Sequence, residues 1–389
     1  MAPWSRPAVR WALPAGIVAI VVGGSLAPAW SASAGAVDLP DRTVEQLLTD
    51  LQTAEVAGFS GTLAHTADLG LPALPEGAPH STDATALLDG SHTLRVWYAG
   101  PDRVRVAVHS TLGELDIRSD GTDVWTWSSD DRTATHLVVP DGAGEKGHAG
   151  RPEELPFTPE QLTDLVLQAI EPTTKVSTGA ERTVAGRPVY ELVVEPAAPG
   201  SLIGSIRIAV DAAEHVPTQV QVFPTGSDVA ALDVGFTDLS FAVPGDDVFT
   251  FTPPEGATVE EVTPGATEHE GLFRGPSEGL GTPGDLAALR PPVTVVGEGW
   301  SSVVVARPGL AGLAALAAAG AGAADDEGSA GLTTLLANLP TVEGDWGSGR
   351  LLTSRLFSVL LTDDGRVLAG AVDAATLQTA AGDPAAALG

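Results

Sequence analysis

The chain has 389 residues, no cysteine, and 50 acidic against 20 basic side chains, which gives a formal net charge of −30 at pH 7. This length accommodates one large domain or two smaller ones with an ample core. The lack of cysteine excludes disulfides, thiolate metal sites, cysteine nucleophiles and lipid attachment at a cysteine of this chain. The charge argues against nucleic acid as a partner, because nucleic-acid binding depends on basic side chains that neutralise phosphates.

Residues 1–36 have the pattern of a signal peptide or signal-anchor. Arg6 and Arg10 precede an apolar stretch at 15–30, and small residues that fit an A-x-A cleavage rule follow at 32–36. Basic residues before the apolar stretch and acidic residues after it place the rest of the chain outside the cytoplasm. We therefore expect an extracytoplasmic protein that is either anchored in the membrane by this N-terminal segment or secreted.

Residues 38–254 are expected to form one curved sheet with two helices. Apolar residues at helical spacing after Thr43 predict a helix that ends before Gly58, and Thr158-Pro159 predicts the start of a second helix at 160–170. Alternating segments joined by short turns predict strands that pair antiparallel as a meander. The predicted strands are 59–66, 92–98, 103–109, 112–118, 124–128, 133–139, 174–178, 183–184, 189–195, 204–210, 218–223, 232–241 and 249–251.

The expected fold class is α+β. A meander of about ten strands usually curls, and curling around helices leaves an apolar concavity, so the region should be an incomplete antiparallel β-barrel lidded by helices. The Pro- and Gly-rich residues 255–291 are typical of a linker. Residues 292–382 predict a small C-terminal α+β module. Its expected strands are 293–296, 300–306, 350–361 and 366–372, followed by a helix from Asp373.

Catalytic motifs are absent from the sequence. It contains no H-E-x-x-H, no P-loop and no G-x-S-x-G elbow between a strand and a helix. We therefore expect a protein that is not an enzyme and needs no cofactor and no metal. His65 and His109 could hold a metal together with an acidic residue, but we interpret the histidines on predicted strands as solvated side chains. Cross-strand ion pairs are expected among Arg103, Arg105, Glu114 and Asp116.

Three segments of the sheet region carry a family resemblance. They read V-W-Y-A-G-P-D-R-V-R at 96–105, S-D-G-T-D-V-W-T-W at 119–127 and F-T-F-T-P-P-E-G at 249–256. In this order they resemble the LolA superfamily of periplasmic lipoprotein carriers, in its secreted branch from high-GC bacteria, over about residues 40–260. The resemblance implies an incomplete barrel that holds acyl chains in an apolar cavity. Well-studied carriers have a basic residue just before the strand-turn proline, where this chain has Gly100.

The cavity predicted from this fold would be lined by helix leucines and by strand residues of one parity. Core packing is the alternative role of the tryptophans in the set, because a cavity wall and a core wall use the same residues. The expected lining is Leu47, Leu51, Leu63, Leu94, Val96, Tyr98, Val104, Val106, Trp125, Trp127, Leu162 and Leu165. The implied partners are lipid or lipoprotein acyl chains.

A second resemblance concerns the order of the two regions. RseB-type regulators of envelope stress join a LolA-like domain to a small C-terminal α+β domain, and residues 359–380 have a similar strand–strand–helix order. This resemblance implies lipid sensing, or binding to an envelope membrane protein such as an anti-sigma factor, as the alternative function.

Overall fold

The computed structural model describes residues 39–71, 89–109, 113–138, 173–262, 293–307 and 339–383. The predicted signal segment, most of the predicted linker, and the helix expected at 160–170 with Leu162 and Leu165 lie outside these ranges. Within the described ranges, no helix is long and apolar enough to cross a membrane.

The first described helix, α3 (Val44–Thr53), begins at a capping box. The Thr43 hydroxyl accepts a hydrogen bond from the Gln46 backbone N at 3.3 Å, and the Gln46 side chain accepts one from the Thr43 backbone N at 2.9 Å. Such reciprocal bonds satisfy backbone N–H groups that the first helical turn leaves unpaired. The apolar stripe of the helix buries Leu47 completely, at 0 % exposure. The helix predicted from periodicity is therefore confirmed.

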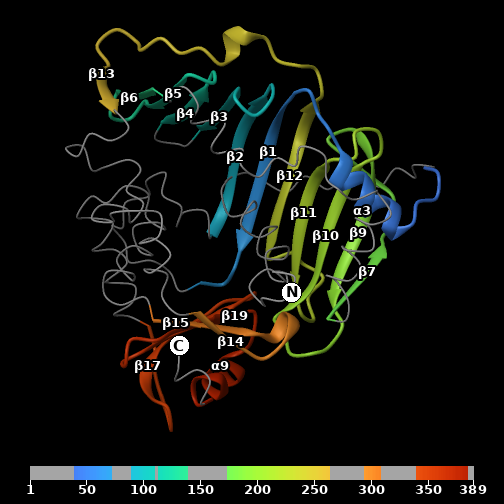
Figure 1. Ribbon diagram of the computed structural model, residues 1–389, viewed down its shortest axis with the longest axis vertical. Coiled ribbons are helices and arrows are strands. Elements are labelled where there is room, and N and C mark those ends of the chain that lie inside the picture. Colours follow the sequence, from blue (N-terminus) through green and yellow to red (C-terminus); the bar gives the residue numbers. More distant parts are fainter. Residues whose placement is uncertain are drawn as a thin grey trace, which may run out of the picture.

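The large sheet has thirteen strands in the described residues, in the order β13-β6-β5-β4-β3-β2-β1-β12-β11-β10-β9-β7, with β8 paired to β9. The strands are β1 (Phe59–Asp68), β2 (Asp89–Tyr98), β3 (Val104–His109), β4 (Glu114–Ser119), β5 (Asp123–Ser128), β6 (Thr133–Val138), β7 (Thr174–Thr178), β8 (Arg182–Val184), β9 (Arg187–Pro196), β10 (Ile203–Asp211), β11 (Pro217–Pro224), β12 (Leu232–Ser240) and β13 (Thr258–Val262). The central strand β1 pairs with both β2 and β12, so the two halves of the meander form one continuous curved sheet (Figure 1). This arrangement confirms the predicted open antiparallel barrel.

The end of this region differs from the prediction. Residues 249–251 do not form a strand; they follow a 3-10 helix, η3 (Asp246–Val248), and lead to Pro253 and Pro254, which cannot donate ladder hydrogen bonds. Thr258–Val262, which we expected in the linker, instead forms β13 and pairs parallel with β6. The sheet therefore extends beyond the predicted boundary.

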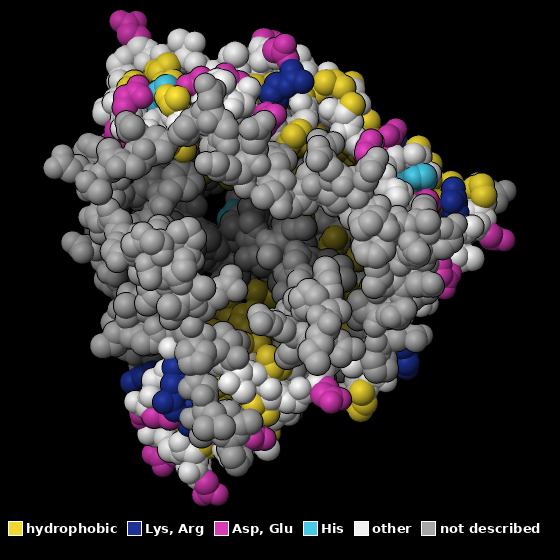
Figure 2. Space-filling view, in the orientation of Figure 1, with side chains coloured by type: hydrophobic (Ala, Val, Ile, Leu, Met, Phe, Trp, Pro, Cys, Tyr) yellow, Lys and Arg dark blue, Asp and Glu magenta, His cyan; other side chains and the backbone are white. Residues whose placement is uncertain are grey.

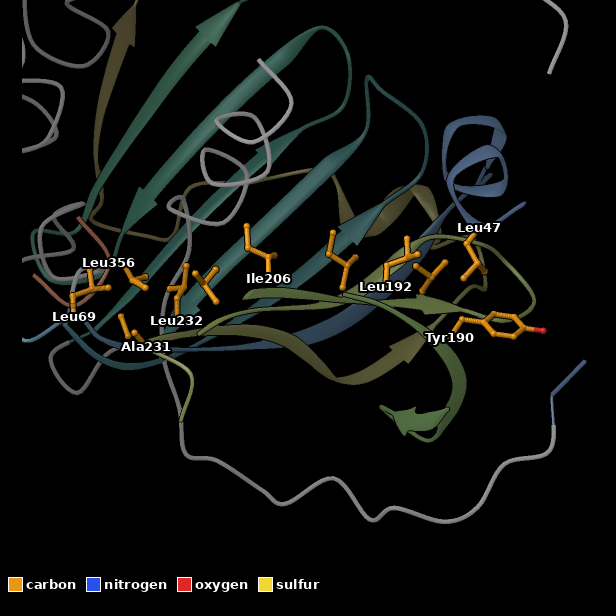
Figure 3. Packing of buried hydrophobic residues seen from close by; sticks show 12 residues of the cluster. Leu47, Leu69, Tyr190, Leu192, Ile206, Ala231, Leu232 and Leu356 are labelled. Carbon is orange, nitrogen blue, oxygen red and sulfur yellow. The ribbon is translucent and has the colours of Figure 1, made fainter. Parts of the chain in front are cut away.

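The strand register defines two faces of the large sheet, because residues paired across neighbouring strands lie on the same side. We call the side that carries Leu47 of α3 the inner face and the opposite side the outer face. Leu47 belongs to one buried cluster with Leu192, Ile206 and Val222, all of which share the inner face. Figure 3 shows Leu192 and Ile206 below Leu47, within this cluster.

The second sheet belongs to the C-terminal module and, in the part of the chain that the structure describes, has six strands in the order β14-β15-β19-β18-β17-β16. Its elements are β14 (Val293–Val296), η4 (Gly299–Ser301), β15 (Val303–Ala306), β16 (Thr341–Gly344), β17 (Gly347–Thr353), β18 (Ser358–Thr362), β19 (Val367–Gly370) and α9 (Ala374–Ala381). The predicted helix after Asp373 is confirmed, and the Asp373 side chain accepts a hydrogen bond from the Thr376 backbone N at 2.8 Å. The single strand predicted at 350–361 is interrupted by a turn, in which Ser354 accepts hydrogen bonds from following backbone N–H groups.

The C-terminal module is joined to the large sheet by a shared core. Leu356, Phe357 and Trp300 pack in the same cluster as Leu47 and the inner-face residues of β9–β12. The two parts also share backbone hydrogen bonds, from Arg355 N to the Leu69 carbonyl and from Leu202 N to the Ala371 carbonyl, each at 2.7 Å. The module therefore covers one end of the inner face (Figure 1).

Candidate functional site

Among the described residues of β1–β12, the inner face of the large sheet carries no charged side chain; on the edge strand β13, Glu260 lies on the inner side, opposite Thr135. Every charged side chain that the structure describes on β1–β12 lies on the outer face, as the cross-strand register assigns it. These residues are Asp68, Arg95, Arg105, Glu114, Asp116, Arg118, Asp123, Lys175, Arg182, Arg187, Glu191, Glu195, Arg207, Asp211, Asp233 and Asp238. The inner positions of the same strands are mainly Val, Leu and Ile. Strict alternation of this kind is typical of a sheet with one apolar and one solvated face.

Part of this apolar face is accessible. Leu94 is 6 % exposed, whereas its neighbours Val96, Val104 and Val106 are partly buried. Ile117, which lies directly opposite Val106, is 40 % exposed. The space-filling view shows hydrophobic side chains in the middle of this side of the molecule (Figure 2). An accessible, uncharged surface is therefore available beside the closed core under α3.

The register divides the residues that we predicted to line a cavity. Eight of them share the inner side: Leu47, Leu51, Leu63, Leu94, Val96, Tyr98, Val104 and Val106. Trp125 and Trp127 lie on the outer face, because they pair with Arg118 and Asp116 on β4. These two tryptophans therefore cannot share a wall with the other eight. Leu162 and Leu165 are outside the described residues.

The outer-face tryptophans pack against polar and aromatic partners. The Trp125 ring stacks on His136 with centroids 4.0 Å apart and lies 5.3 Å from Phe251. His136 also bridges two carboxylates, with Nε2 2.5 Å from Asp123 and Nδ1 2.8 Å from Glu261. Burial acts to lower the pKa of His136, but the hydrogen bonds with these carboxylates raise it above its ordinary value. The cluster ties β5, β6 and β13 together.

A buried carboxylate organises the arginines of the outer face. Asp116 is 2 % exposed and accepts hydrogen bonds from Arg105 Nη2 and Arg118 Nη2, both at 2.7 Å. The Arg105 guanidinium also lies 4.5 Å from the Trp97 ring centroid. The expected ion pair of Arg105 with Asp116 is therefore found, but Arg103 bonds to Asp246 and not to Glu114. Sequence spacing could not show this because Asp246 comes from the far end of the region.

The rim of the inner face holds two aromatic residues that the sequence analysis missed, Phe59 and Phe236, beside the predicted Tyr98. Phe59 stacks on Tyr98 at 5.4 Å and meets Phe236 edge-on at 6.0 Å. Gly61 is required here because a Cβ atom would lie 2.8 Å from the Phe236 ring. Beside Tyr98, a depression of about 560 Å³ opens between the end of α3 and the β2–β3 turn. It is lined by Ala54, Glu55, Val56, Ala57, Tyr98, Gly100 and Pro101.

Two histidines interrupt the apolar inner face. His65 on β1 lies directly opposite His92 on β2. His65 is only 1 % exposed, so its interpretation as a solvated side chain was wrong. Burial lowers its pKa to about 4, and burial together with the charge of His65 lowers the pKa of His92 to about 3. The described residues contain no group of three or more side chains that could hold a metal ion.

Comparisons with known proteins give fold-level similarities. The chain matches no protein-family profile and no curated protein. Solved structures similar to it include the MucA/MucB complex of Pseudomonas aeruginosa, at 14 % identity and a TM-score of 0.37, over 87 % of this chain and 96 % of that one. A LolA superfamily protein from Nitrosomonas europaea matches at 10 % identity and a TM-score of 0.20, over 54 % and 99 % of the two chains.

A conserved protein of Thermus thermophilus, described as uncharacterised, matches at 8 % identity and a TM-score of 0.30, over 56 % of this chain and 98 % of that one. The sequence motifs resemble the LolA superfamily, and a protein of that superfamily is among the solved structures similar to this chain. At these TM-scores the function has to be argued from the site itself.

Proposed function

We propose that this protein binds the acyl chains of a lipid or lipoprotein on the inner face of its large sheet and acts as a non-enzymatic carrier outside the cytoplasmic membrane. The observation that supports the proposal is the separation of charge on β1–β12, where all described charged side chains lie on the outer face. A protein without a ligand gains nothing from an accessible apolar face of this extent, and exposed apolar patches mark binding sites.

The chemistry of the face favours an alkyl chain over a polar ligand. Each methylene buried against valine and leucine side chains contributes about 0.8 kcal/mol. Val96, Val106 and Ile117 provide a row of such side chains across β2, β3 and β4. A charged group placed on this row would lose its hydration without gaining a partner.

The proposed location rests on residues 1–36, whose sequence is typical of a signal peptide or signal-anchor. The formal charge of −30 would repel anionic lipid headgroups at a membrane surface. Uptake of a lipid would therefore depend on its acyl chains and not on headgroup attraction.

The first experiment measures bound lipid directly. The purified protein is extracted with organic solvent and the extract is analysed by mass spectrometry, and a fluorescent acyl probe is titrated into the delipidated protein. We expect copurified lipid and saturable probe fluorescence. Lack of both would refute the proposal.

A matched pair of variants tests whether the inner face binds the acyl chain. Ile117→Glu places a charge on the inner face, whereas Val259→Glu places one on the outer side of β13, at a residue opposite Ala134. The two side chains are 40 % and 44 % exposed, so the folding cost of the two substitutions should be similar. We expect only Ile117→Glu to weaken probe binding, by tenfold or more. Equal binding by both variants would place the acyl site elsewhere.

A second candidate function is a sensor that binds an envelope membrane protein. It is favoured by the shared core, since Leu356 and Phe357 of the C-terminal module pack in the same cluster as the inner face. A ligand on this face would therefore act on the position of the module. Its test is a pull-down from solubilised membranes. A stoichiometric partner whose binding changes when the acyl site is filled would favour the sensor, and a lack of such a partner would count against it.

A further inference from the structure

The His65–His92 pair lies within the apolar surface and is itself a polar site. His65 pairs with His92 on β2 and with Val234 on β12, so its ring belongs to the inner face. Two positions further along the same two strands, Leu63 lies opposite Leu94. An acyl chain that lies on these leucines would therefore bring its end, or an internal functional group, to the histidines.

One ring nitrogen of this pair has no partner. Nδ1 of His65 is buried and makes no hydrogen bond in the described part of the chain. A buried polar group is usually hydrogen-bonded, and an unsatisfied one destabilises the folded protein. An unpaired nitrogen at 1 % exposure in the middle of a binding face therefore indicates that a ligand supplies the missing partner.

The surroundings decide which ligand group can fill this position. The inner face of β1–β5 and β9–β12 holds no Lys or Arg among its described side chains, so a buried carboxylate or phosphate would find no cation. Burial lowers the pKa of both rings, to about 4 for His65 and about 3 for His92, and the charge of His65 also opposes the protonation of His92, so the pair is neutral at pH 7. A neutral imidazole offers one N–H donor. When the proton of His65 is on Nδ1, the complementary ligand group is a neutral acceptor.

We propose that His65 and His92 form a carbonyl-binding site, in which Nδ1–H of His65 donates a hydrogen bond to the ester carbonyl of an esterified acyl chain. This inference rests on the proposed acyl-binding function and narrows its ligand from acyl chains in general to acyl esters. His92 contributes by keeping a second neutral ring, and no charge, directly opposite the donor. Acylated glycerolipids and lipoproteins both carry such esters, and the mass spectrum of the copurified material distinguishes the two sources.

The test compares three ligands of equal chain length in displacing the fluorescent acyl probe: a fatty-acid methyl ester, the free fatty acid and the alkane. We expect the ester to compete about tenfold better than the alkane, as pairing one buried polar atom implies. The free acid should compete less well than the ester at pH 7. If ester, acid and alkane compete equally, the carbonyl site is refuted while acyl binding stands. If none displaces the probe, the acyl-binding function itself fails.

A variant pair assigns the effect to His65. His65→Phe keeps an aromatic ring but removes the donor, and it should abolish the preference for the ester while leaving alkane competition unchanged. His136→Phe is the matched control, because His136 lies on the outer face, and it should retain the preference. Loss of the preference in both variants, or retention in both, would refute the assignment.

NMR of the wild-type protein makes the test independent of whether His65→Phe folds. The His65 Nδ1 resonance, observed with labelled histidine, should move when the methyl ester is added and stay unchanged with the alkane. An ester that binds without moving this resonance would overturn the proposal.

Discussion

The two faces of the large sheet use the same residue types in opposite ways. On the outer face, His136 lies between Asp123 and Glu261, is stacked on Trp125, and has a raised pKa. On the inner face, burial lowers the pKa of His65 to about 4, and no carboxylate of the described residues raises it. Histidine is therefore a member of a charged network on one side and a neutral polar group in an apolar surface on the other.

The comparison distinguishes the residues that stabilise this sheet from the residues that are available to bind a ligand. Around Asp116 the outer face satisfies its polar groups internally, through Arg105 and Arg118, although Nη2 of Arg182 elsewhere on this face has no partner among the described residues. The inner face leaves apolar area accessible at Ile117 and one ring nitrogen unpaired at His65. Substitutions on the outer face should accordingly change stability and leave acyl binding unchanged, whereas substitutions on the accessible inner face should change binding.

The largest expected effect is on the outer face. Asp116→Ala leaves Arg105 and Arg118 without their shared carboxylate, and breaking such a buried ion network costs about 3–5 kcal/mol of unfolding free energy. Denaturant unfolding measures this loss, and binding of the acyl probe by the folded fraction should be unchanged. Asp102→Ala, at an exposed turn position, removes the same charge and should change the stability by less than about 0.5 kcal/mol. Weakened probe binding in folded Asp116→Ala would break the distinction between the faces.

The pH dependence of stability should reveal the inner-face histidine. His65 has a pKa of about 4 in the folded protein, below its ordinary value of 6.5, so the unfolded chain binds more protons between these pH values. Stability is complete above pH 6.5 and falls as the pH decreases toward 4, by up to about 3 kcal/mol from this residue. His65→Phe should remove its own part of this decline, as measured by urea midpoints at a series of pH values, and should leave the part that His92, with a pKa lowered to about 3, contributes over the same range. His136 has the opposite shift, so His136→Phe should leave this decline in place.

The smallest expected effect concerns the tryptophan that we first assigned to the cavity. Trp125→Leu removes the stack on His136 and should cost about 1 kcal/mol, the usual contribution of an aromatic pair beyond its area. Because Trp125 lies on the outer face, the affinity for the acyl probe should not change. Val96→Asn, on the inner face, should weaken binding. A loss of affinity in Trp125→Leu would restore the original assignment of this residue.

Local features of the fold were predictable because they depend on residues close together in the chain. Thr43 and Gln46 form the cap of α3 within one turn, and Asp373 caps α9 in the same way. The hairpins β2–β3 and β4–β5 follow from turns at Gly100-Pro101 and Asp120-Gly121, where Gly100 and Gly121 adopt positive φ values of 95° and 102°. Short turns of this kind also predict which strands pair.

The composition of the candidate site was only partly predictable. Alternation separates Val124 and Thr126 from Trp125 and Trp127, but it does not reveal which set meets the inner strands. Both sets contain apolar residues, and tryptophan was assigned to the cavity on hydrophobicity alone. The deciding contacts are the pairings of Trp125 with Arg118 and of Trp127 with Asp116. A register derived from the Asp120-Gly121 turn would have placed the tryptophans correctly.

By itself, the sequence determined the α+β class, the order of helices and strands, the open antiparallel sheet and the strong negative charge, because these depend on periodicity, caps, turns and composition. Only the tertiary structure decided that the described charges of β1–β12 all share one face, that the C-terminal module packs against the core of the sheet, and that His65 is buried without a partner for Nδ1 among the described residues. These properties depend on strand pairings and contacts between residues far apart in the chain. The alternation of side chains along a strand assigns each residue to one of the two faces of the sheet. Burial by distant segments then makes one of those faces the interior.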